Sequence, residues 1–394
     1  MDRFGEKVNC NPTVKLEKGN IYPRVEIERI KPGYKYVESD GFFEFEGGSG
    51  SKFQDGDVLM ARITPCLENG KIAIADLNGD NGSGSTELFV FRGIKGISDT
   101  DYIYYLLCMP HMKQLAANSM TGASGRQRAD IGFIKRIKWD FPEIQVQQKI
   151  AGILSNYDRL IRVNTERIRT LEKIAENLYK RWFVHFQFPG YKNVKIIKGI
   201  PEGWEVKRIR EYGRIETGKT PSMEIMENYG DDVLFVKTPD MHGNTFIIET
   251  DEMLSEQGSL TQPKKLLPPN SIMVTCIGTG GVVSINAEPA HTNQQINSII
   301  PSNPNYLEWL YYTCCSLKET IEMFGATGTT MTNLSKGKFE KLKVLDPGEI
   351  IVSEFHEIVN PIMCEIRSLM YQNQTIIKEK ELLLPRLMNR KITV

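Results

Sequence analysis

The chain of 394 residues contains no apolar run long enough to cross a bilayer, which takes about 20 consecutive apolar residues. Residues 1–12, MDRFGEKVNCNP, also lack the apolar centre of a secretory signal. We therefore expect no membrane span and a cytoplasmic location.

Cysteine and histidine lack the spacing of a metal site. The seven cysteines form no CxxC pair, Cys314 and Cys315 are adjacent, and the five histidines are scattered. Zinc sites in proteins use closely spaced Cys and His ligands. We therefore expect no metal, and reduced thiols of the kind found in cytoplasmic proteins.

Familiar catalytic motifs are missing as well. The sequence has no GxSxG, no HExxH, no DPPY or NPPY of an adenine-N6 methyltransferase, and no convincing PD-(D/E)xK nuclease pattern. Net charge is also lacking, since 49 Lys and Arg balance 49 Asp and Glu. This balance counts mildly against nucleic-acid binding, but a local basic face would suffice for phosphate contacts.

What the sequence does contain is an internal repeat. Pro142 and Pro347, 205 residues apart, each precede a long segment whose apolar residues alternate at spacings of four and three. This spacing is typical of a coiled-coil seam. The first seam consists of Ile150, Leu154, Tyr157, Ile161, Asn164, Ile168, Leu171, Ala175, Leu178 and Trp182. The second consists of Phe355, Val359, Ile362, Ile366, Leu369, Asn373, Ile376, Lys380, Leu383 and Leu387.

The residues before each seam support a true duplication. Two heptad patterns align at some offset by chance, but Ile137 with Leu342 and Lys138 with Lys343 share the same offset of 205. Upstream, similar strand patterns, helix starts and Gly-rich polar loops recur in both halves. The predicted fold is α+β: two similar α/β modules joined by two long antiparallel coiled-coil helices with pseudo-two-fold symmetry.

Each predicted helix has 35 to 40 residues, hence roughly 50–60 Å of length, and needs a partner helix to bury its stripe. An antiparallel pair would bring Asn164 and Asn373 together, so we predict a hydrogen bond between them that fixes the register. The alternative is that these are ordinary polar residues on partly exposed helices. Lys380 in the seam favours this alternative, as does Pro361, which should kink or restart the second helix.

One string resembles a nucleotide site. GRIETGKT, residues 213–220, fits the Walker A pattern GxxxxGK[ST]. A phosphate-binding loop needs a buried strand before it and a helix starting at the lysine. The preceding EVKRIRE is too charged for such a strand, and Pro221 follows at once. We interpret the string as an ordinary loop, with an NTPase as the less favoured alternative.

Polar loops in both modules carry the side chains that suit DNA. SGRQR at residues 124–128 offers guanidinium and amide groups for base edges or phosphates, and TNQQI at 292–296 and TGTT at 327–330 offer similar donors and acceptors. For any single residue, a turn capped by its own side chains is an equally good interpretation. The hypothesis depends on similar loops occurring in both copies.

Several segments resemble specificity subunits of type I restriction–modification systems. Trp182-Phe183, Phe188-Pro189 and IPEGWE at 200–205 resemble the junction between the two halves of such subunits. TGKTPS at 217–222, FVKTPD at 235–240, LPPN at 267–270 and TNQQIN at 292–297 resemble one class of target recognition domain. LLLPRLM at 382–388 resembles the closing segment of the distal helix. The resemblance covers nearly the whole chain and is most specific from 140 to 394.

The resemblance implies a domain plan: target recognition domain 1 at 1–141, a central helix at 142–184, a linker at 185–200, target recognition domain 2 at 201–346, and a distal helix at 347–394. Each domain would read half of a bipartite double-stranded DNA target. Candidate DNA contacts are Arg62, Lys71, Ser124, Arg126, Gln127, Arg128, Lys219, Thr220, Lys237, Thr238, Asn293, Gln294, Gln295, Thr329, Thr330 and Asn333.

The resemblance also implies partners. Such a chain is not itself catalytic. It holds two methyltransferase subunits that use S-adenosylmethionine, and it joins translocase–nuclease subunits that use ATP and Mg²⁺. A scaffold of paired helices that binds no DNA is the competing hypothesis, and the specificity half of a fused, type IIG-like system is a closer variant.

Overall fold

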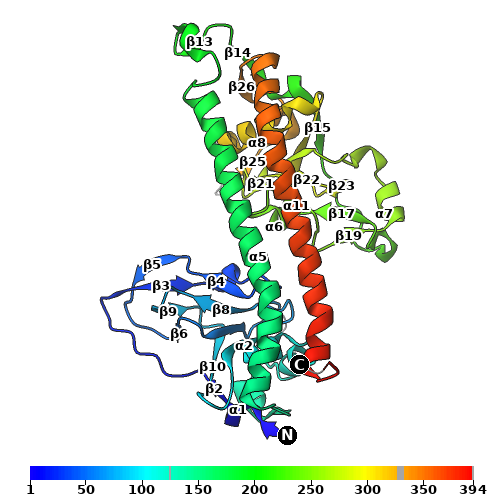
Figure 1. Ribbon diagram of the computed structural model, residues 1–394. Helices are drawn as coiled ribbons and strands as arrows, with labels where there is room; N and C mark the ends of the chain where they lie inside the picture. Colours follow the sequence, from blue (N-terminus) through cyan, green and yellow to red (C-terminus); the bar gives the residue numbers. More distant parts are fainter. Residues whose placement is uncertain (124–125, 326–331, 393–394) are drawn as a thin grey trace. The chain divides into compact units, whose positions relative to one another are not determined.

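The computed structural model describes residues 1–123, 126–325 and 332–392. The chain divides into two compact units. Unit 1 comprises Met1–Asn164 and Asn373–Val394, and unit 2 comprises Thr165–Gln372. Each unit therefore contains one α+β module together with a stretch of each long helix, α5 (Ile144–Tyr179) and α11 (Glu349–Met388) (Figure 1, green and orange to red).

The module of unit 1 contains two sheets (Figure 1, blue to cyan). The first has the order β2-β10-β7-β8-β4, with antiparallel neighbours except for the parallel pair β4–β8. Its strands are β2 (Val8–Cys10), β10 (Leu88–Gly93), β7 (Val58–Ala61), β8 (Ile72–Asp76) and β4 (Tyr36–Glu38). The second sheet, β5-β3-β9-β6, consists of β5 (Gly41–Glu44), β3 (Ile21–Val25), β9 (Asn81–Gly84) and β6 (Ser51–Gln54).

Short helices and one small strand pair complete this module: α1 (Phe4–Lys7), α2 (Thr100–Cys108), α3 (Pro110–Asn118), α4 (Ile131–Arg136), β1 (Asp2–Arg3) and β11 (Lys138–Trp139). Asp99 caps α2 by accepting a hydrogen bond from the Tyr102 amide at 2.9 Å. Asp130 caps α4 in the same way through Gly132 and Phe133. These side chains satisfy amides that a helix start leaves without an internal partner.

The module of unit 2 repeats this topology. Its main sheet has the order β15-β24-β20-β22-β18, again antiparallel except for the last pair, β18–β22. The strands are β15 (Gly213–Thr217), β24 (Ile296–Pro301), β20 (Ile272–Thr275), β22 (Val283–Asn286) and β18 (Phe246–Ile247). Because strand order and direction agree with those of unit 1, the predicted duplication is confirmed.

The remaining elements of unit 2 surround this sheet. A second sheet, β16-β19-β17-β23, consists of β16 (Tyr229–Gly230), β19 (Met253–Leu254), β17 (Val233–Val236) and β23 (Ala290–Thr292). The strand pairs are β12 (Ile196–Ile197) with β13 (Ile200–Pro201), β14 (Glu205–Arg208) with β26 (Lys343–Asp346), and β21 (Ile277–Gly278) with β25 (Thr332–Asn333). The helices are α6 (Thr238–Met241), α7 (Glu256–Leu260), α8 (Leu307–Ser316), α9 (Lys318–Gly325) and α10 (Lys336–Phe339).

The long helices pack on each other in both units. In unit 1, Asn164 pairs with Asn373 and Asp158 with Lys380. Residue numbers therefore decrease along α5 where they increase along α11. The two segments are therefore antiparallel, as predicted. The same holds in unit 2, where the rings of Phe183 and Phe355 lie 4.9 Å apart and Arg167 contacts Glu365 at 2.8 Å. Every predicted seam residue is buried or half-buried.

Apolar side chains of the long helices join the core of each module. In unit 1, Leu154 and Leu387 are 0% and 1% exposed and pack in one cluster with residues of α2 and β10. Burying such a side chain stabilises the fold by roughly 1.5–3 kcal/mol. One expectation is wrong: Pro361 does not restart the second helix, since α11 is continuous from Glu349 to Met388.

Candidate functional site

In unit 1, backbone hydrogen bonds join three distant segments into one polar surface. The amide of Arg62 donates to the carbonyl of Glu87 at 2.9 Å, and the amide of Ala129 donates to the carbonyl of Arg62 at 2.8 Å. Arg128 forms isolated β-bridges with Ile63 and with Thr121. The predicted loop around residues 121–129 is therefore attached to the end of β7.

The side chains on this surface form a charge pair that the sequence did not reveal. The Arg128 Nε lies 2.9 Å from both carboxylate oxygens of Glu87, and its Nη2 lies 2.5 Å from Oε1. The hydrogen bonds that Arg128 donates to the Glu87 carboxylate raise the pKa of the Arg128 guanidinium above its usual value. The guanidinium of Arg62 lies 4.9 Å from the centre of the Phe89 ring, and its buried Nε has no hydrogen-bond partner among the described residues.

The other candidates in this module lie in different settings. Arg126 is exposed, and the carbonyl of Gln127 accepts a hydrogen bond from the Thr64 amide at 3.0 Å. Lys71 donates through Nζ to the carbonyl of Ile27 at 3.0 Å, which makes it part of the module's internal structure. Ser124 lies outside the described residues.

Unit 2 uses the same backbone pattern. The amide of Cys276 donates to the carbonyl of Gln295 at 2.7 Å, and the amide of Leu334 donates to the carbonyl of Cys276 at 2.9 Å. Asn333, on β25, pairs with Ile277 on β21. The segment that follows the undescribed residues 326–331 is thus attached to the end of β20.

Several predicted residues of unit 2 meet at this place. Thr220 donates through Oγ1 to Gln294 Oε1 at 2.7 Å. Gln295 Oε1 accepts from Asn293 Nδ2 at 3.0 Å and from Thr238 Oγ1 at 3.4 Å. The structure therefore brings together the loops after β15, β17 and β23.

The remaining candidates of unit 2 are not part of this cluster. Lys237 forms an ion pair with Glu252, and its Nζ lies 5.5 Å from the centre of the Phe235 ring. The Lys219 side chain is exposed, although its amide donates to the carbonyl of Thr292 at 2.9 Å. Thr329 and Thr330 lie outside the described residues.

The Walker-like string does not form a phosphate loop. Residues 213–217 are strand β15, an edge strand that pairs antiparallel with β24, and no helix begins at Lys219. Both glycines of the string are needed for close packing. A Cβ on Gly213 would lie 2.3 Å from the Ile300 carbonyl oxygen, and one on Gly218 would lie 2.2 Å from that of Thr292. The hypothesis of a nucleotide site at 213–220 is therefore wrong.

A chain of buried polar side chains, which the sequence did not indicate, contacts the loop that contains Lys219 in unit 2. His291, fully buried on β23, lies with Nε2 2.8 Å from Ser259 Oγ. Gln262 Nε2 lies 3.5 Å from His291 Nδ1 and 3.0 Å from the Lys219 carbonyl oxygen, to which it donates. Burial lowers the pKa of His291 to about 4.

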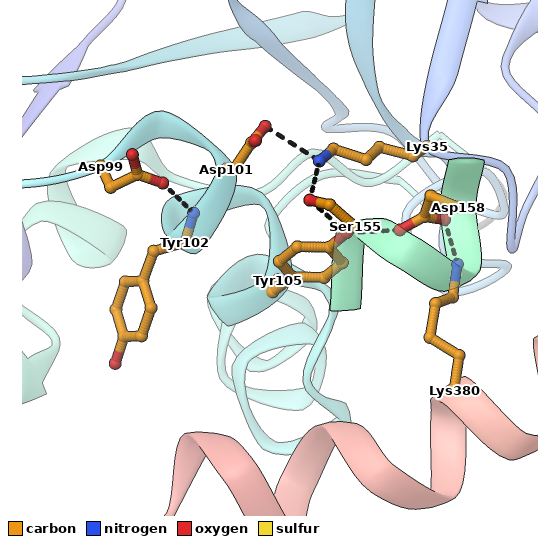
Figure 2. Close-up of polar contacts among 8 residues, drawn as sticks. All are labelled: Lys35, Asp99, Asp101, Tyr102, Tyr105, Ser155, Asp158 and Lys380. Carbon is orange, nitrogen blue, oxygen red and sulfur yellow. Dashed lines mark hydrogen bonds and ion pairs between the residues drawn. The ribbon is translucent and has the colours of Figure 1, made fainter. Parts of the chain in front are cut away.

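A second buried network attaches the module of unit 1 to both long helices (Figure 2). Lys35 donates to Ser155 Oγ at 2.8 Å and contacts Asp101 at 2.9 Å. Tyr105 donates to Asp158, and Lys380 Nζ lies 2.6 Å from the other Asp158 oxygen. Lys380, which appeared out of place in the seam, therefore has a buried counter-ion.

The predicted contact between the two asparagines is confirmed. Asn164 Nδ2 donates to Asn373 Oδ1 at 3.0 Å, and both side chains are buried. Among the described residues, no group of three or more potential metal ligands occurs, and no helix is long and apolar enough to span a bilayer.

Two modules of one topology, each displaying a polar surface on the same backbone pattern, define a duplicated recognition protein. Residues 6–173 and 201–349 match the type I restriction modification DNA specificity domain. The chain therefore belongs to this family, and it is a DNA specificity subunit of a type I restriction–modification system. Subunits of this family are in general not catalytic.

Individual relatives agree. The chain is 29% identical to the type I restriction enzyme HindI specificity subunit of Haemophilus influenzae, over 95% of each chain. It is 26% identical to the MjaIX specificity subunit of Methanocaldococcus jannaschii, over 87% of this chain and 79% of the relative. The crystal structure of the type I S subunit from M. genitalium shares the fold, with a TM-score of 0.54 and 15% identity over 98% of this chain and 95% of that one.

Proposed function

We propose that each module binds one half of a bipartite duplex DNA target, through the surface built around residues 62, 87 and 128 in unit 1 and 276, 295 and 333 in unit 2. One observation supports this proposal above all others. The backbone hydrogen bonds of the two surfaces are the same, whereas the side chains that they display differ. A common frame with different side chains suits the recognition of two different half-sites.

The long helices would set the distance between the half-sites and carry two methyltransferase subunits. The chain itself would supply no catalytic group. S-adenosylmethionine would bind to the methyltransferase subunits, and ATP with Mg²⁺ to the translocase–nuclease subunits. Because such a complex acts on the host DNA, the chain would work in the cytoplasm. The exposed apolar residues of α5, Leu160, Val163 and Ile174, support a protein contact along this helix.

The methylated adenines of the host genome test this proposal. Sequencing that detects modified bases should find a two-part motif with an adenine methylated in each half, and the motif should disappear when the chain is deleted. A seven-residue insertion into both helices should keep the two half-sites and lengthen the spacer by roughly three base pairs, from a rise of about 1.5 Å per helix residue and about 3.4 Å per base pair. A motif without two parts, or one independent of the chain, would contradict the proposal.

A further inference from the structure

The two recognition surfaces can be aligned residue by residue through their backbone hydrogen bonds. In unit 1, one residue at the end of β7 donates to the segment before β10 and accepts from the segment after the polar loop. In unit 2, one residue after β20 makes the same two bonds with the corresponding segments. The matched residues are Arg62 with Cys276, Glu87 with Gln295, and Ala129 with Leu334.

This alignment makes Arg128 and Asn333 equivalent. Each immediately precedes the residue that donates to the end of the strand, and each forms a β-bridge with an isoleucine, Ile63 or Ile277. The sequence offset between them is the same 205 that relates the two helices. The two positions occupy the same place on the frame but carry different chemistry, a guanidinium in one module and a carboxamide in the other.

In unit 1, Glu87 fixes the orientation of the Arg128 side chain. Its carboxylate occupies the edge formed by Nε and Nη2, and Nη1 donates to the Arg126 carbonyl oxygen at 3.3 Å. Because Nη1 and Nη2 each carry two hydrogens, one N–H group of each is left beyond these bonds. The Arg128 side chain is 42% exposed. Guanine displays two acceptors, O6 and N7, on its major-groove edge, and paired N–H groups of an arginine match them. A guanidinium held from behind by a carboxylate is therefore preorganised for guanine.

In unit 2, Gln295 is equivalent to Glu87, and its side chain is likewise held by hydrogen bonds. Gln295 Oε1 is occupied by donors from Asn293 and Thr238, which hold the amide in place. Asn333, the equivalent of Arg128, is exposed. Its carboxamide has one donor group and one acceptor group. Adenine displays the complementary pair, an acceptor at N7 and a donor at N6.

We propose that positions 128 and 333 are equivalent base-reading positions, at which Arg128 selects a guanine in one half-site and Asn333 selects an adenine in the other. This inference rests on the proposed function. It adds which residue of each module reads a base and which base each one selects. Glu87 and Gln295 are positioning residues that act through their neighbours.

The experiment uses the chain in its own complex and host, with the methylated motif as the readout. The key variant is Arg128→Lys, because lysine keeps the positive charge and loses the paired donors. The guanine preference at one position of one half-site, on the order of tenfold to a hundredfold, should disappear. The other half-site should be unchanged. Asn333→Ala should relax one adenine in the opposite half-site and leave the first one intact.

Two further variants test whether the effect is specific to Arg128 and whether it depends on the Glu87 charge. Arg136→Ala removes an exposed arginine of the same module that takes no part in the hydrogen bonds among residues 62, 87, 128 and 129. The motif should stay as in the wild type. Glu87→Gln keeps the size of the side chain and removes the charge that orients Arg128. It should weaken the guanine preference at the same position that Arg128→Lys relaxes.

The outcomes distinguish this inference from the function on which it rests. A wild-type motif without two parts would contradict the proposed function, and the inference would fail with it. A normal two-part motif that Arg128→Lys leaves equally specific at every position would show that Arg128 contacts only phosphates, which overturns the inference alone. Relaxation at a base other than guanine, or in both half-sites, would also overturn it.

Discussion

The side-chain amide of Asn164 donates to the amide oxygen of Asn373 at 3.0 Å, within a seam whose neighbouring residues are apolar. The two side chains are 5% and 3% exposed. A buried amide pair stabilises helix packing less than two leucines would, but it is satisfied only when the two residues face each other. It therefore favours one register among several that the heptad spacing allows.

The first prediction concerns this pair. Asn164→Leu alone removes the hydrogen bond that Asn164 donates to the buried Asn373 amide oxygen and places an apolar side chain beside it, so unit 1 should lose roughly 1–3 kcal/mol of stability. The double variant Asn164→Leu/Asn373→Leu should recover most of this loss, because neither buried amide of the pair remains and two leucines can pack together. Hydrogen exchange of the α5 and α11 peptides in unit 1 measures both effects.

Spin labels on the two helices of unit 1 test the register itself. Their distance distribution should be narrow in the wild type and broader in the double leucine variant. Asn156→Leu, an exposed position of the same helix, is the matched control and should change neither measurement. A narrow distribution in the double variant would remove the register role of the asparagines.

The second prediction concerns the buried ion pair of unit 1. Lys380→Ala leaves Asp158 buried without its cation, which should cost about 3–5 kcal/mol. In unit 2 the ion pair is replaced by apolar residues, since Met363 and Ala175 occupy the positions equivalent to Asp158 and Lys380. Tyr312 there contacts Met363 Sδ at 3.9 Å, just as Tyr105 contacts Asp158. The double variant Asp158→Met/Lys380→Ala should therefore be more stable than Lys380→Ala.

Chemical denaturation of the variants measures the difference. Lys35 keeps its contacts with Asp101 and Ser155 in both variants, so the comparison isolates Asp158 and Lys380. Lys378→Ala, which removes an exposed lysine two residues before Lys380, should have little effect. If the double variant were less stable than Lys380→Ala, the apolar pair of unit 2 could not replace the ion pair of unit 1.

The helical frame could be predicted from the sequence because its signal is local and periodic. The seam residues, the two helix lengths and the contact between Asn164 and Asn373 all followed from heptad spacing and one offset. The partner of Lys380 could not be found in this way, since Asp158 lies outside the seam and Tyr105 belongs to the module. The restart expected at Pro361 does not occur, because residues on both sides of the proline, such as Val359 and Met363, pack in the core and keep α11 continuous.

The recognition surfaces were predicted only in part. Repeated polar loops indicated Arg128, Gln295 and Asn333, but their equivalence depends on hydrogen bonds between segments far apart in the chain. Glu87 was missed because a single glutamate before a strand has no sequence signature. The charge of Lys71 and Lys237 suggests phosphate contacts, but in the structure both side chains bind partners within their own module.

A third prediction concerns pH. His291 has a pKa of about 4 in the folded chain, below the value near 6.5 of an unfolded histidine. The unfolded chain therefore binds the proton more readily as the pH falls. The stability that neutral His291 contributes is complete above about pH 6.5 and is lost as the pH falls toward 4, by about 3 kcal/mol in total.

Tryptophan fluorescence during denaturation reports on unit 2, which contains three of the four tryptophans, Trp182, Trp204 and Trp309. His291→Gln should remove most of this dependence between pH 6.5 and 4. His242→Gln changes an exposed histidine of the same module and should preserve it. Equal pH profiles for the wild type and His291→Gln would contradict the assignment.

A fourth prediction follows from the place of Lys219. Its side chain is exposed beyond an edge strand, so Lys219→Ala should not change ATP hydrolysis by the purified chain or by the complex. The same variant should weaken DNA binding if Lys219 contacts a phosphate. ATP hydrolysis by the pure chain that depends on Lys219 would restore the nucleotide hypothesis.

The fifth prediction concerns DNA binding by the chain without its partners. Its 49 basic and 49 acidic residues cancel, and Arg128 and Lys237 are already paired with Glu87 and Glu252. Each phosphate that a protein neutralises adds about 0.9 to the slope of log K against log salt. The isolated chain should therefore bind a target duplex weakly and with a shallow salt slope, whereas the complex with methyltransferase subunits should show a steeper one.

A salt titration of both forms on the same duplex, with a scrambled duplex as the control, measures this difference. If the partners supply most of the phosphate contacts, the target preference of the complex should persist at salt concentrations where the isolated chain no longer binds. Nanomolar, sequence-specific binding by the isolated chain at physiological salt would mean instead that this chain provides the phosphate contacts itself, despite its neutral charge.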